Sequence, residues 1–515
     1  MRRLTGDRAL LVVWGLMAVW AGVFAWLSVL RYRTFSTGRF DLGNMVQAVW
    51  STSEGRLFQT TDVSGKEFNR LGAHVDPILA LFTPLWMMWS SPEVLLVAQA
   101  VIVATGALPA FWLGRRWLRD DRLAVAAAAV YLLYPGLQHS VLFDFHPVTL
   151  AAPLLLFCIW AAEEGRWWTL GVCAALAALS QEQVGVMLAT LAVWMAVRHP
   201  DRRRAAAVLG IGGLLWVAIA LLVIMPAFAI DPGVNPHVSR YSSLGDGPTD
   251  ILITFLTRPW DAVAVLITPG RGIYLLALFL PLLLLPFAAP LLAACALPQL
   301  LINLFASSGP AQSLQYHYTA VLVPFLVAAS ILGLANLRDR GVPKRVAERL
   351  APLIARPGLT ALLLVGTLVL AGARQGPLPV WSWLPIGWQG SPLHQFSRDD
   401  QTRALQQAVG MIPPDAVVSA TNAPASHLSA RRVIYLFPKR NTNSDFIVVA
   451  DNRRYRAIAQ DRPTLRPASY RGSLNQLIGS PYWKLIYDRE GVLLFQRRRP
   501  PAITPTPSTP VGRAS

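Results

Sequence analysis

Charge is what this sequence has least of: Asp, Glu, Lys and Arg make up 14% of its 515 residues, whereas 54% are hydrophobic. A soluble protein carries roughly a quarter charged residues, so a soluble globular class is excluded. Apolar runs recur along the chain, and about 20 apolar residues are enough for one helix to cross a bilayer. The composition therefore predicts an α-helical protein that crosses a membrane many times.

Cysteine and catalytic signature motifs are also scarce. The three cysteines, Cys158, Cys173 and Cys295, lie inside apolar segments and have neither disulfide nor zinc spacing. The chain contains no P-loop, no H-E-x-x-H, no G-x-S-x-G and no G-x-G-x-x-G in a nucleotide-binding context. Nothing in it resembles the paired half-helices of a secondary transporter. The sequence therefore indicates neither the enzyme classes that carry these motifs nor a secondary transporter.

The chain carries a net charge of +18, a sign that can indicate a nucleic-acid partner. Its basic residues, however, cluster in short loops between apolar runs, at 114–122, 198–204 and 337–349. Membrane proteins concentrate Lys and Arg in their cytoplasmic loops. The charge thus predicts which loops face the cytoplasm, and no nucleic-acid partner is expected.

The first apolar run, about 22 residues long, is longer than the core of a cleaved secretory signal, which spans about 7–15 residues. We therefore predict an uncleaved transmembrane helix over residues 9–30, with a cleaved signal as the alternative. The polar segment 31–76 then forms a first outer loop. The apolar run 77–89 is too short to span and predicts an interfacial helix.

With this assignment the basic loops fall on the cytoplasmic side. The loops at 140–147 and 181–183, which contain no Lys or Arg, fall outside. The pattern predicts about eleven spans in a transmembrane domain, with the N-terminus in the cytoplasm. This domain covers residues 1–373.

The composition changes after residue 373. A linker is expected at 374–394, followed by short β-rich runs that predict a small extracytoplasmic α/β domain at 395–498. The Pro/Thr/Ser-rich end, 499–515, predicts a disordered tail.

Polar residues that are out of place in so apolar a chain gather at the predicted outer face. A carboxylate in hydrocarbon costs on the order of 2.5–3.5 kcal/mol, so such groups usually face a hydrated cavity and pair there. Carboxylates and imidazoles together can exchange protons with a substrate or bind a divalent cation. The candidates are Asp41, His74, Asp76, Asp144, His146 and Glu182.

Most of these candidates also have a structural explanation. Asp41 could cap a helix that begins at Leu42, because Asp is a favoured N-cap residue. His74 and Asp76 could close a turn before Pro77.

Asp144 and His146 could serve a turn and a cap, whereas Glu182 has apolar helical sequence on both sides and is harder to explain in this way. Aromatic residues at 316–318 fit a belt at the membrane interface. Arginines on the predicted outer side could bind lipid phosphate or extend towards the interface. These arginines are Arg31, Arg33, Arg240, Arg258 and Arg271.

Several segments resemble, in order, the motifs of a bacterial family of predicted membrane proteins of unknown function. They are FDLGNMVQAVW, LGAHVDPILALFTPLW, YLLYPGLQHSVLFDFHP, SQEQVG, HYTAVLVPFL and IPPDAVVSATNAPASHLSARRVIYLFP. The resemblance covers most of residues 38–450. Where that family often has Lys-Glu-Asp, this chain has Gln181, Glu182 and Gln183, a departure that leaves Glu182 in place but weakens a role for its neighbours.

More distantly, the architecture is similar to that of the GT-C glycosyltransferases, which include protein mannosyltransferases and aminoarabinose transferases. The resemblance implies a GT-C-like fold that transfers a sugar from a polyprenyl-phosphate donor to an acceptor, at the outer face of the bacterial cytoplasmic membrane. It also implies that Asp41 is the essential acidic residue of the first loop, which takes the proton of the acceptor hydroxyl, and that Asp144 or Glu182 supports it.

The same resemblance implies how the substrate is held. The departing phosphate would be stabilised by Arg31 or Arg240, or by a divalent metal ion at His146 together with Asp144 and Glu182. Further substrate contacts are expected from His74, Asp76, Tyr316 and His317. Membrane lipids are the other expected partners.

Two other classes are alternatives to a glycosyltransferase. One is a non-enzymatic transporter or scaffold for lipid-linked saccharides or cell-envelope assembly, and the other is a metal-dependent lipid phosphatase. Transport predicts polar groups along a path through the membrane, whereas here they concentrate at one predicted face. A phosphatase would release phosphate without an acceptor.

Overall fold

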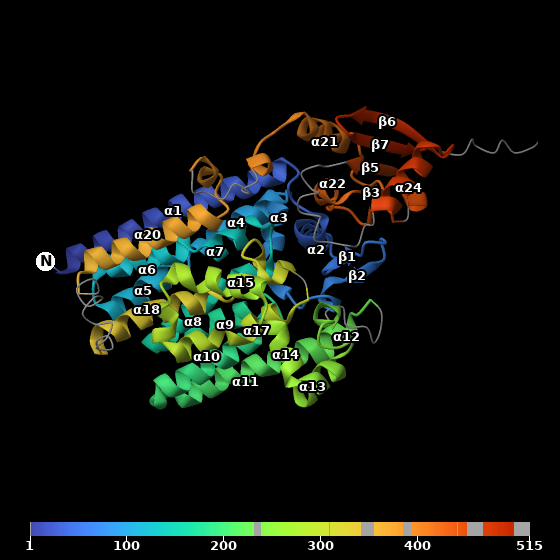
Figure 1. Ribbon diagram of the computed structural model, residues 1–515. Coiled ribbons are helices and arrows are strands. Elements are labelled where there is room, and N and C mark those ends of the chain that lie inside the picture. The colour runs from blue at the N-terminus through green and yellow to red at the C-terminus, as the bar shows by residue number, and fades with distance from the viewer. Residues whose placement is uncertain are drawn as a thin grey trace, which may run out of the picture.

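Helices make up the larger part of the protein, and the long ones lie side by side in one body (Figure 1). The computed structural model describes residues 2–230, 238–307, 309–340, 355–384, 393–439, 441–450 and 467–498. The longer helices are α1 (Arg2–Arg33), α4 (Glu93–Ala104), α5 (Ala107–Leu118), α6 (Asp121–Leu133), α7 (Pro135–Leu142), α8 (Ala151–Glu164), α9 (Trp167–Ala178), α10 (Val184–Arg198), α11 (Arg203–Ile219), α18 (Val323–Arg340) and α20 (Pro357–Gln375). Shorter helices follow α11, namely α12 (Met225–Ala227), α13 (Pro248–Thr257), α14 (Pro259–Leu266), α15 (Pro269–Phe279), α16 (Pro290–Ala293) and α17 (Leu297–Phe305).

Among the described residues, five helical segments are long and apolar enough to cross a membrane, and the number rises to seven if each of two bent pairs is one span. The five are Arg8–Arg33, Glu93–Leu118, Pro147–Glu164, Pro200–Ala227 and Pro357–Gln375. The bent pairs are Asp121–Leu133 with Pro135–Leu142 and Pro259–Leu266 with Pro269–Leu282. A mostly helical membrane protein is therefore confirmed, and the higher count of spans stays a prediction.

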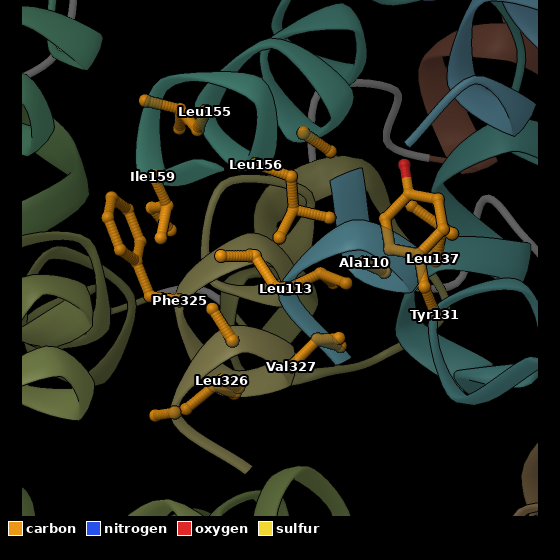
Figure 2. Packing of buried hydrophobic residues seen from close by; sticks show 14 of the residues in the cluster. Ala110, Leu113, Tyr131, Leu137, Leu155, Leu156, Ile159, Phe325, Leu326 and Val327 are labelled. Atoms are coloured by element: carbon orange, nitrogen blue, oxygen red, sulfur yellow. The ribbon is translucent and has the colours of Figure 1, made fainter. Parts of the chain in front are cut away.

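The interior of the helical body is apolar and closely packed. Figure 2 shows side chains of α5, α8 and α18 meeting there, among them the fully buried Leu113, Leu156 and Val327. Lipid tails are as apolar as leucine, so van der Waals packing rather than escape from water holds such helices together. This packing fixes the helix ends, and with them the loops that carry the polar candidates.

A mixed five-stranded sheet lies beyond the end of the body that is away from the N-terminus (Figure 1). The strand order is β4-β3-β5-β7-β6, with β3 parallel to β4 and β5, and β7 antiparallel to β5 and β6. The elements are β3 (Val418–Ala420), β4 (Ile434–Leu436), β5 (Phe446–Ala450), β6 (Trp483–Arg489), β7 (Val492–Arg497), α21 (Asp400–Gly410), α22 (Asn422–His427) and α24 (Pro467–Ile478).

This sheet falls within 395–498, where the sequence predicts an α/β domain. The limits of that domain, its extracytoplasmic side and the linker 374–394 stay predictions. The segment 499–515, predicted to be disordered, lies outside the described residues.

The segment between α1 and α4 folds at the same end as the sheet (Figure 1). It consists of a π-helical turn η1 (Arg39–Gly43), α2 (Asn44–Ser53), a hairpin of β1 (Gln59–Thr61) and β2 (Glu67–Asn69), a 3-10 helix η3 (Pro77–Phe82) and α3 (Thr83–Met88). Of these, η3 and α3 occupy the segment where the sequence predicts an interfacial helix. Their location at the membrane interface stays a prediction. The amide of Leu436 in β4 donates to the carbonyl of Val63 at 3.1 Å and joins the sheet to this loop.

Two glycines let α10 and α11 cross at close range. A Cβ on Gly185 of α10 would lie 2.3 Å from the carbonyl oxygen of Gly213 of α11, and a Cβ on Gly213 would lie 2.5 Å from the carbonyl oxygen of Gly185. Neither position therefore accepts a side chain unless the helices move apart. Because α10 begins at Val184, this crossing also fixes the loop that carries Glu182.

Replacing Gly185 with alanine is expected to lower the stability of the detergent-purified protein by roughly 1–3 kcal/mol, because the added methyl group forces α10 and α11 apart. Thermal unfolding measures the change. Gly212→Ala is the matched control, since a Cβ there meets nothing within 4 Å. Equal unfolding midpoints for the two variants would contradict the close crossing.

Candidate active site

A cavity of about 300 Å³ lies where the first loop meets the helical body, at the end that carries the sheet. Side chains from well-separated stretches of the chain form its wall. The predicted site residues that line it are Asp41, His74, Asp76, His146, Arg240 and His317. Sequence reasoning missed other polar lining residues, among them Arg70, Gln181, Gln299, Asn303 and Tyr318. The loops thus bring six of the predicted residues to one cavity.

Asp41 and His146 form an acid–imidazole pair at the cavity wall. The Oδ1 atom of Asp41 lies 3.3 Å from Nε2 of His146. The other ring nitrogen, Nδ1, lies 3.0 Å from the carbonyl oxygen of Phe143, which can only accept, so Nδ1 carries a hydrogen. Nε2 is therefore the ring nitrogen that faces the carboxylate of Asp41. The amide of His146 also donates to Oε1 of Gln99 at 2.9 Å, which fixes the loop.

Asp41 does not cap the helix that follows it. It lies inside η1, whose N-cap is Gly38, and α2 begins only at Asn44. The alternative explanation of Asp41 as the N-cap of a helix starting at Leu42 is therefore wrong. The backbone of Asp41 lies in the turn, while its side chain contacts His146 and lines the cavity.

Asp144 supplies the capping interactions from a different loop. Its Oδ2 atom accepts from the amides of Gly38 at 2.9 Å and Leu42 at 3.5 Å, so it holds both ends of the turn that carries Asp41. Burial raises the pKa of Asp144 to about 6, against the opposing effect of Arg31. Asp144 stands behind the cavity wall, so we assign it a positioning role rather than a catalytic one.

Arg31 belongs to the same buried support. Its Nη1 atom lies 3.8 Å from Oδ1 of Asp144, its Nη2 donates to the carbonyl of Ser36 at 3.0 Å, and its Nε donates to Gln395 at 3.1 Å. The side chain is only 6% exposed and does not line the cavity. Its predicted contact with a substrate phosphate is therefore not supported, because its charge is directed to Asp144.

Glu182 and His74 form a second acid–imidazole pair. Oε1 of Glu182 lies 3.1 Å from Nδ1 of His74, and Oε2 accepts from the amide of Val75 at 2.9 Å. Burial alone would raise the pKa of Glu182, but the charge and hydrogen bond of His74 and the amide outweigh it and lower the pKa to about 2. Glu182 is thus a fixed negative charge that holds His74 at the cavity wall, beside Gln181.

Asp76 is held by an arginine of the same loop. Its Oδ2 atom accepts from Nη2 of Arg70 at 2.6 Å and from Nε at 2.9 Å. Both side chains are buried, and burial raises the pKa of Asp76 in spite of Arg70. Removing either partner would leave an unpaired buried charge, which is strongly destabilising. The pair therefore shapes the cavity wall.

His317 and Tyr316 serve the site through their rings. The ring of His317 stacks on that of His146 with 3.7 Å between centroids, and Tyr316 packs edge-on against Phe143 at 4.7 Å. These contacts direct both rings into the protein. They explain these two residues better than a belt at the lipid surface, and His317 is the one of the two that lines the cavity.

The predicted metal site of His146 with Asp144 and Glu182 does not form. Each of the three side chains has a different partner: Asp41 for His146, Arg31 for Asp144 and His74 for Glu182. No group of three His, Cys, Asp or Glu side chains with metal-binding geometry is present in the described part of the chain. The prediction fails because folding brings these three residues to three separate pairs, two acid–imidazole pairs and the Arg31–Asp144 pair.

Helix α22, which contacts the sheet, supports the turn that carries Asp41. Oδ1 of Asn422 accepts from the amides of Arg39 at 2.7 Å and Phe40 at 3.3 Å. The ring of His427 lies between those of Tyr32 and Phe35, at 4.0 and 3.8 Å. The C-terminal part of the chain is thus built into the site.

The model of the family described as "Predicted membrane protein (DUF2079)" matches residues 31–494, and the chain belongs to this family, as its motifs predict. One solved structure that it resembles is ArnT from Cupriavidus metallidurans, crystallised with undecaprenyl phosphate. The identity is 12%, the match covers 93% of this chain and 97% of that chain, and the TM-score is 0.48. No curated protein matches.

Asn422→Ala is expected to loosen η1, because the amides of Arg39 and Phe40 lose their acceptor. Hydrogen–deuterium exchange of peptides covering residues 36–44 should then be faster than in the wild type, with the sheet unchanged. Asn475→Ala, at an exposed position of α24, is the control. Unchanged exchange in the Asn422 variant would show that α22 does not hold the turn.

Glu182→Gln is expected to destabilise the protein at pH 7 by about 2–3 kcal/mol, because the pKa of Glu182 is about 2 in the folded protein and about 4.3 when unfolded. A lowered pKa adds stability above the unfolded value, and this contribution is lost as the pH falls from about 4.3 to about 2. Thermal melts of the wild type and the variant should therefore show a difference in unfolding midpoint at pH 7 that becomes smaller at pH 3. A difference that becomes larger would contradict the assigned pairing.

Proposed function

We propose that this protein is a membrane glycosyltransferase that moves a sugar from a polyprenyl-phosphate donor to an acceptor hydroxyl, with Asp41 as general base. The observation that carries the proposal is the Asp41–His146 pair at the wall of a polar cavity. A carboxylate within hydrogen-bond reach of an imidazole can accept a proton from an attacking hydroxyl, because the imidazole can hydrogen-bond the carboxyl group that forms.

The reaction follows from this arrangement. The acceptor oxygen attacks the anomeric carbon of the donor sugar and forms the new glycosidic bond, while the bond from that carbon to the phosphate oxygen breaks. The acceptor proton passes to the carboxylate of Asp41. His146 stabilises the protonated carboxyl group through Nε2. Polyprenyl phosphate leaves with the electron pair of the broken bond. Positive charge develops at the anomeric carbon, as in glycosidases, and nearby carboxylates stabilise it.

Arg240 is the residue we assign to the donor phosphate. It lines the cavity and is exposed, whereas the other lining arginine, Arg70, is buried in its pair with Asp76. The formal charges of the lining arginines and aspartates sum to zero, because Arg70 and Arg240 balance Asp41 and Asp76. A single phosphate meets less repulsion in such a cavity than a diphosphate, which favours a polyprenyl monophosphate donor.

Apolar residues beside the cavity suit the polyprenyl chain. Ile302 of α17 both lines the cavity and is partly exposed. The neighbouring helices α13 and α14 expose Leu252, Leu256 and Trp260. A lipid-borne donor can therefore place its chain against these helices while its phosphate reaches Arg240. The site would then lie at the boundary between lipid and water.

We place the cavity and the sheet on the outer face of the bacterial cytoplasmic membrane, with the N-terminus inside. The basic ends of α5 and α10, at Arg115, Arg116 and Arg198, support this orientation, because positive residues mark the cytoplasmic side. The apolar cluster between the two ends favours chemistry at one face over transport through the body. A lipid phosphatase would use the same cavity without an acceptor.

Asp41→Asn is expected to reduce sugar transfer by about 10²–10⁴-fold, because the amide cannot take the acceptor proton. The measurement supplies purified protein with radiolabelled polyprenyl-phosphate sugar and an envelope extract, and follows label transfer, free sugar and inorganic phosphate. Donor binding should remain, since the phosphate is held by Arg240.

Asp488→Asn is the control, because Asp488 lies on the exposed edge strand β6. Wild-type transfer by a folded Asp41→Asn variant would remove Asp41 from the mechanism. Release of inorganic phosphate by the wild type from polyprenyl phosphate supplied alone, without label transfer from the sugar donor, would favour the phosphatase.

A further inference from the structure

A second cavity, of about 430 Å³, lies at the opposite end of the helical body, between the ends of α5, α8, α10 and α18. Its charged or polar lining residues are Arg116, Trp117, Arg119, Glu163, Arg198, His199, Asn336 and Asp339. We propose that this cavity binds the phosphodiester of an anionic phospholipid through Arg116, Arg119 and Arg198.

A buried carboxylate holds two of these arginines in position. Glu163 is 1% exposed; its Oε2 accepts from Nε of Arg116 at 3.0 Å and from Nε1 of Trp117 at 3.1 Å, while its Oε1 accepts from Nε of Arg198 at 3.3 Å. His199 lies 3.1 Å from the same oxygen. Each guanidinium is thus anchored by its Nε atom. Arg116 also donates from Nη1 to Oε1 of Glu164 at 2.9 Å, and the terminal nitrogens of the two guanidinium groups carry further N–H donors.

The side chains of Arg116 and Arg198 are 39% and 42% exposed, so they reach the open space although Glu163 anchors them. Arginines held in this way keep the fork of donors that matches phosphate geometry. Arg116 and Arg119 also pair with carboxylates, Glu164 at 2.9 Å and Asp339 at 3.8 Å, whereas Arg198 is held by Glu163 through Nε and can direct its terminal donors to a ligand. A phosphodiester oxygen can accept from such donors.

Capping of helix ends does not account for these arginines. Other residues satisfy the carbonyl groups at those ends: Arg202 donates to the carbonyls of Ala162 and Glu163, and Arg338 donates to that of Leu118 at 3.4 Å. Neither Arg202 nor Arg338 lines the cavity. The donors of the lining arginines are thus not used at these two helix ends, and an anionic ligand is a suitable partner for those that the carboxylates leave open.

Exposed tryptophans place the cavity at the level of lipid headgroups. Trp167 and Trp168 open α9 directly after the end of α8 and are both exposed. Tryptophan gathers at the membrane–water interface, where phosphodiesters also lie. Leu332 and Ala335 of α18 add an apolar wall, which can receive the start of an acyl chain. Basic pockets between transmembrane helices on the cytoplasmic side are known to bind such headgroups.

The test compares thermal stability of the full-length protein in neutral detergent with added phosphatidylglycerol, phosphatidylcholine or inorganic phosphate. Phosphatidylglycerol should raise the wild-type midpoint, and the other two should not. In Arg198→Gln the apparent affinity for phosphatidylglycerol should fall about tenfold, because one charge-assisted hydrogen bond is lost. Arg198→Lys, which keeps the charge, should retain a larger part of the wild-type affinity for phosphatidylglycerol.

Arg33→Gln is the matched control, because Arg33 is a half-exposed arginine held by Glu93 at the other end of the body. It should respond to phosphatidylglycerol like the wild type. An equal response of Arg198→Gln and Arg33→Gln would overturn the site, and stabilisation by inorganic phosphate alone would assign it to a soluble phosphate instead of a lipid. If Arg198→Gln does not fold, Arg119→Gln, an exposed variant outside the Glu163 network, decides the question in the same assay.

Discussion

A charge buried in an apolar protein must be paired, and the site at the sheet end of this protein depends on that requirement at Asp144. The side chain is buried and is met by Arg31 from the end of α1 and by two backbone amides of η1. One carboxylate thereby ties the first helix, the first loop and the loop after α7 together. Since His146 follows only two residues later, the same contact sets its distance to Asp41.

The two acid–imidazole pairs of the cavity differ in their surroundings, and this difference separates their roles. Glu182 is buried and receives a backbone amide as well as His74, which keeps it ionised. Asp41 lines the cavity and is partly exposed. A carboxylate that cannot change its charge is suited to holding a neighbour, whereas one that meets the substrate can take a proton. This difference supports the proposal that Asp41, rather than Glu182, acts as the base.

Both ends of the helical body use a buried carboxylate in the same way. Asp144 orders the turn of Asp41 at one end, and Glu163 orders Arg116 and Arg198 at the other. Between them the packed apolar cluster keeps the two polar sites apart. Charges are costly in such a body, so each one is placed where it organises the groups around it.

Composition and loop charges alone determined that this is a polytopic helical membrane protein, and the family motifs pointed to Asp41, His74 and His146. Local sequence could not show which polar groups meet, because the partners are far apart in the chain. Asp41 and His146 are 105 residues apart, and Asn422 lies 383 residues after the Arg39 amide it holds. Only the tertiary structure decided that Asp144 and Arg31 bind each other instead of a metal ion or a phosphate. The physical reason is that a buried charge takes the partner which folding brings to it.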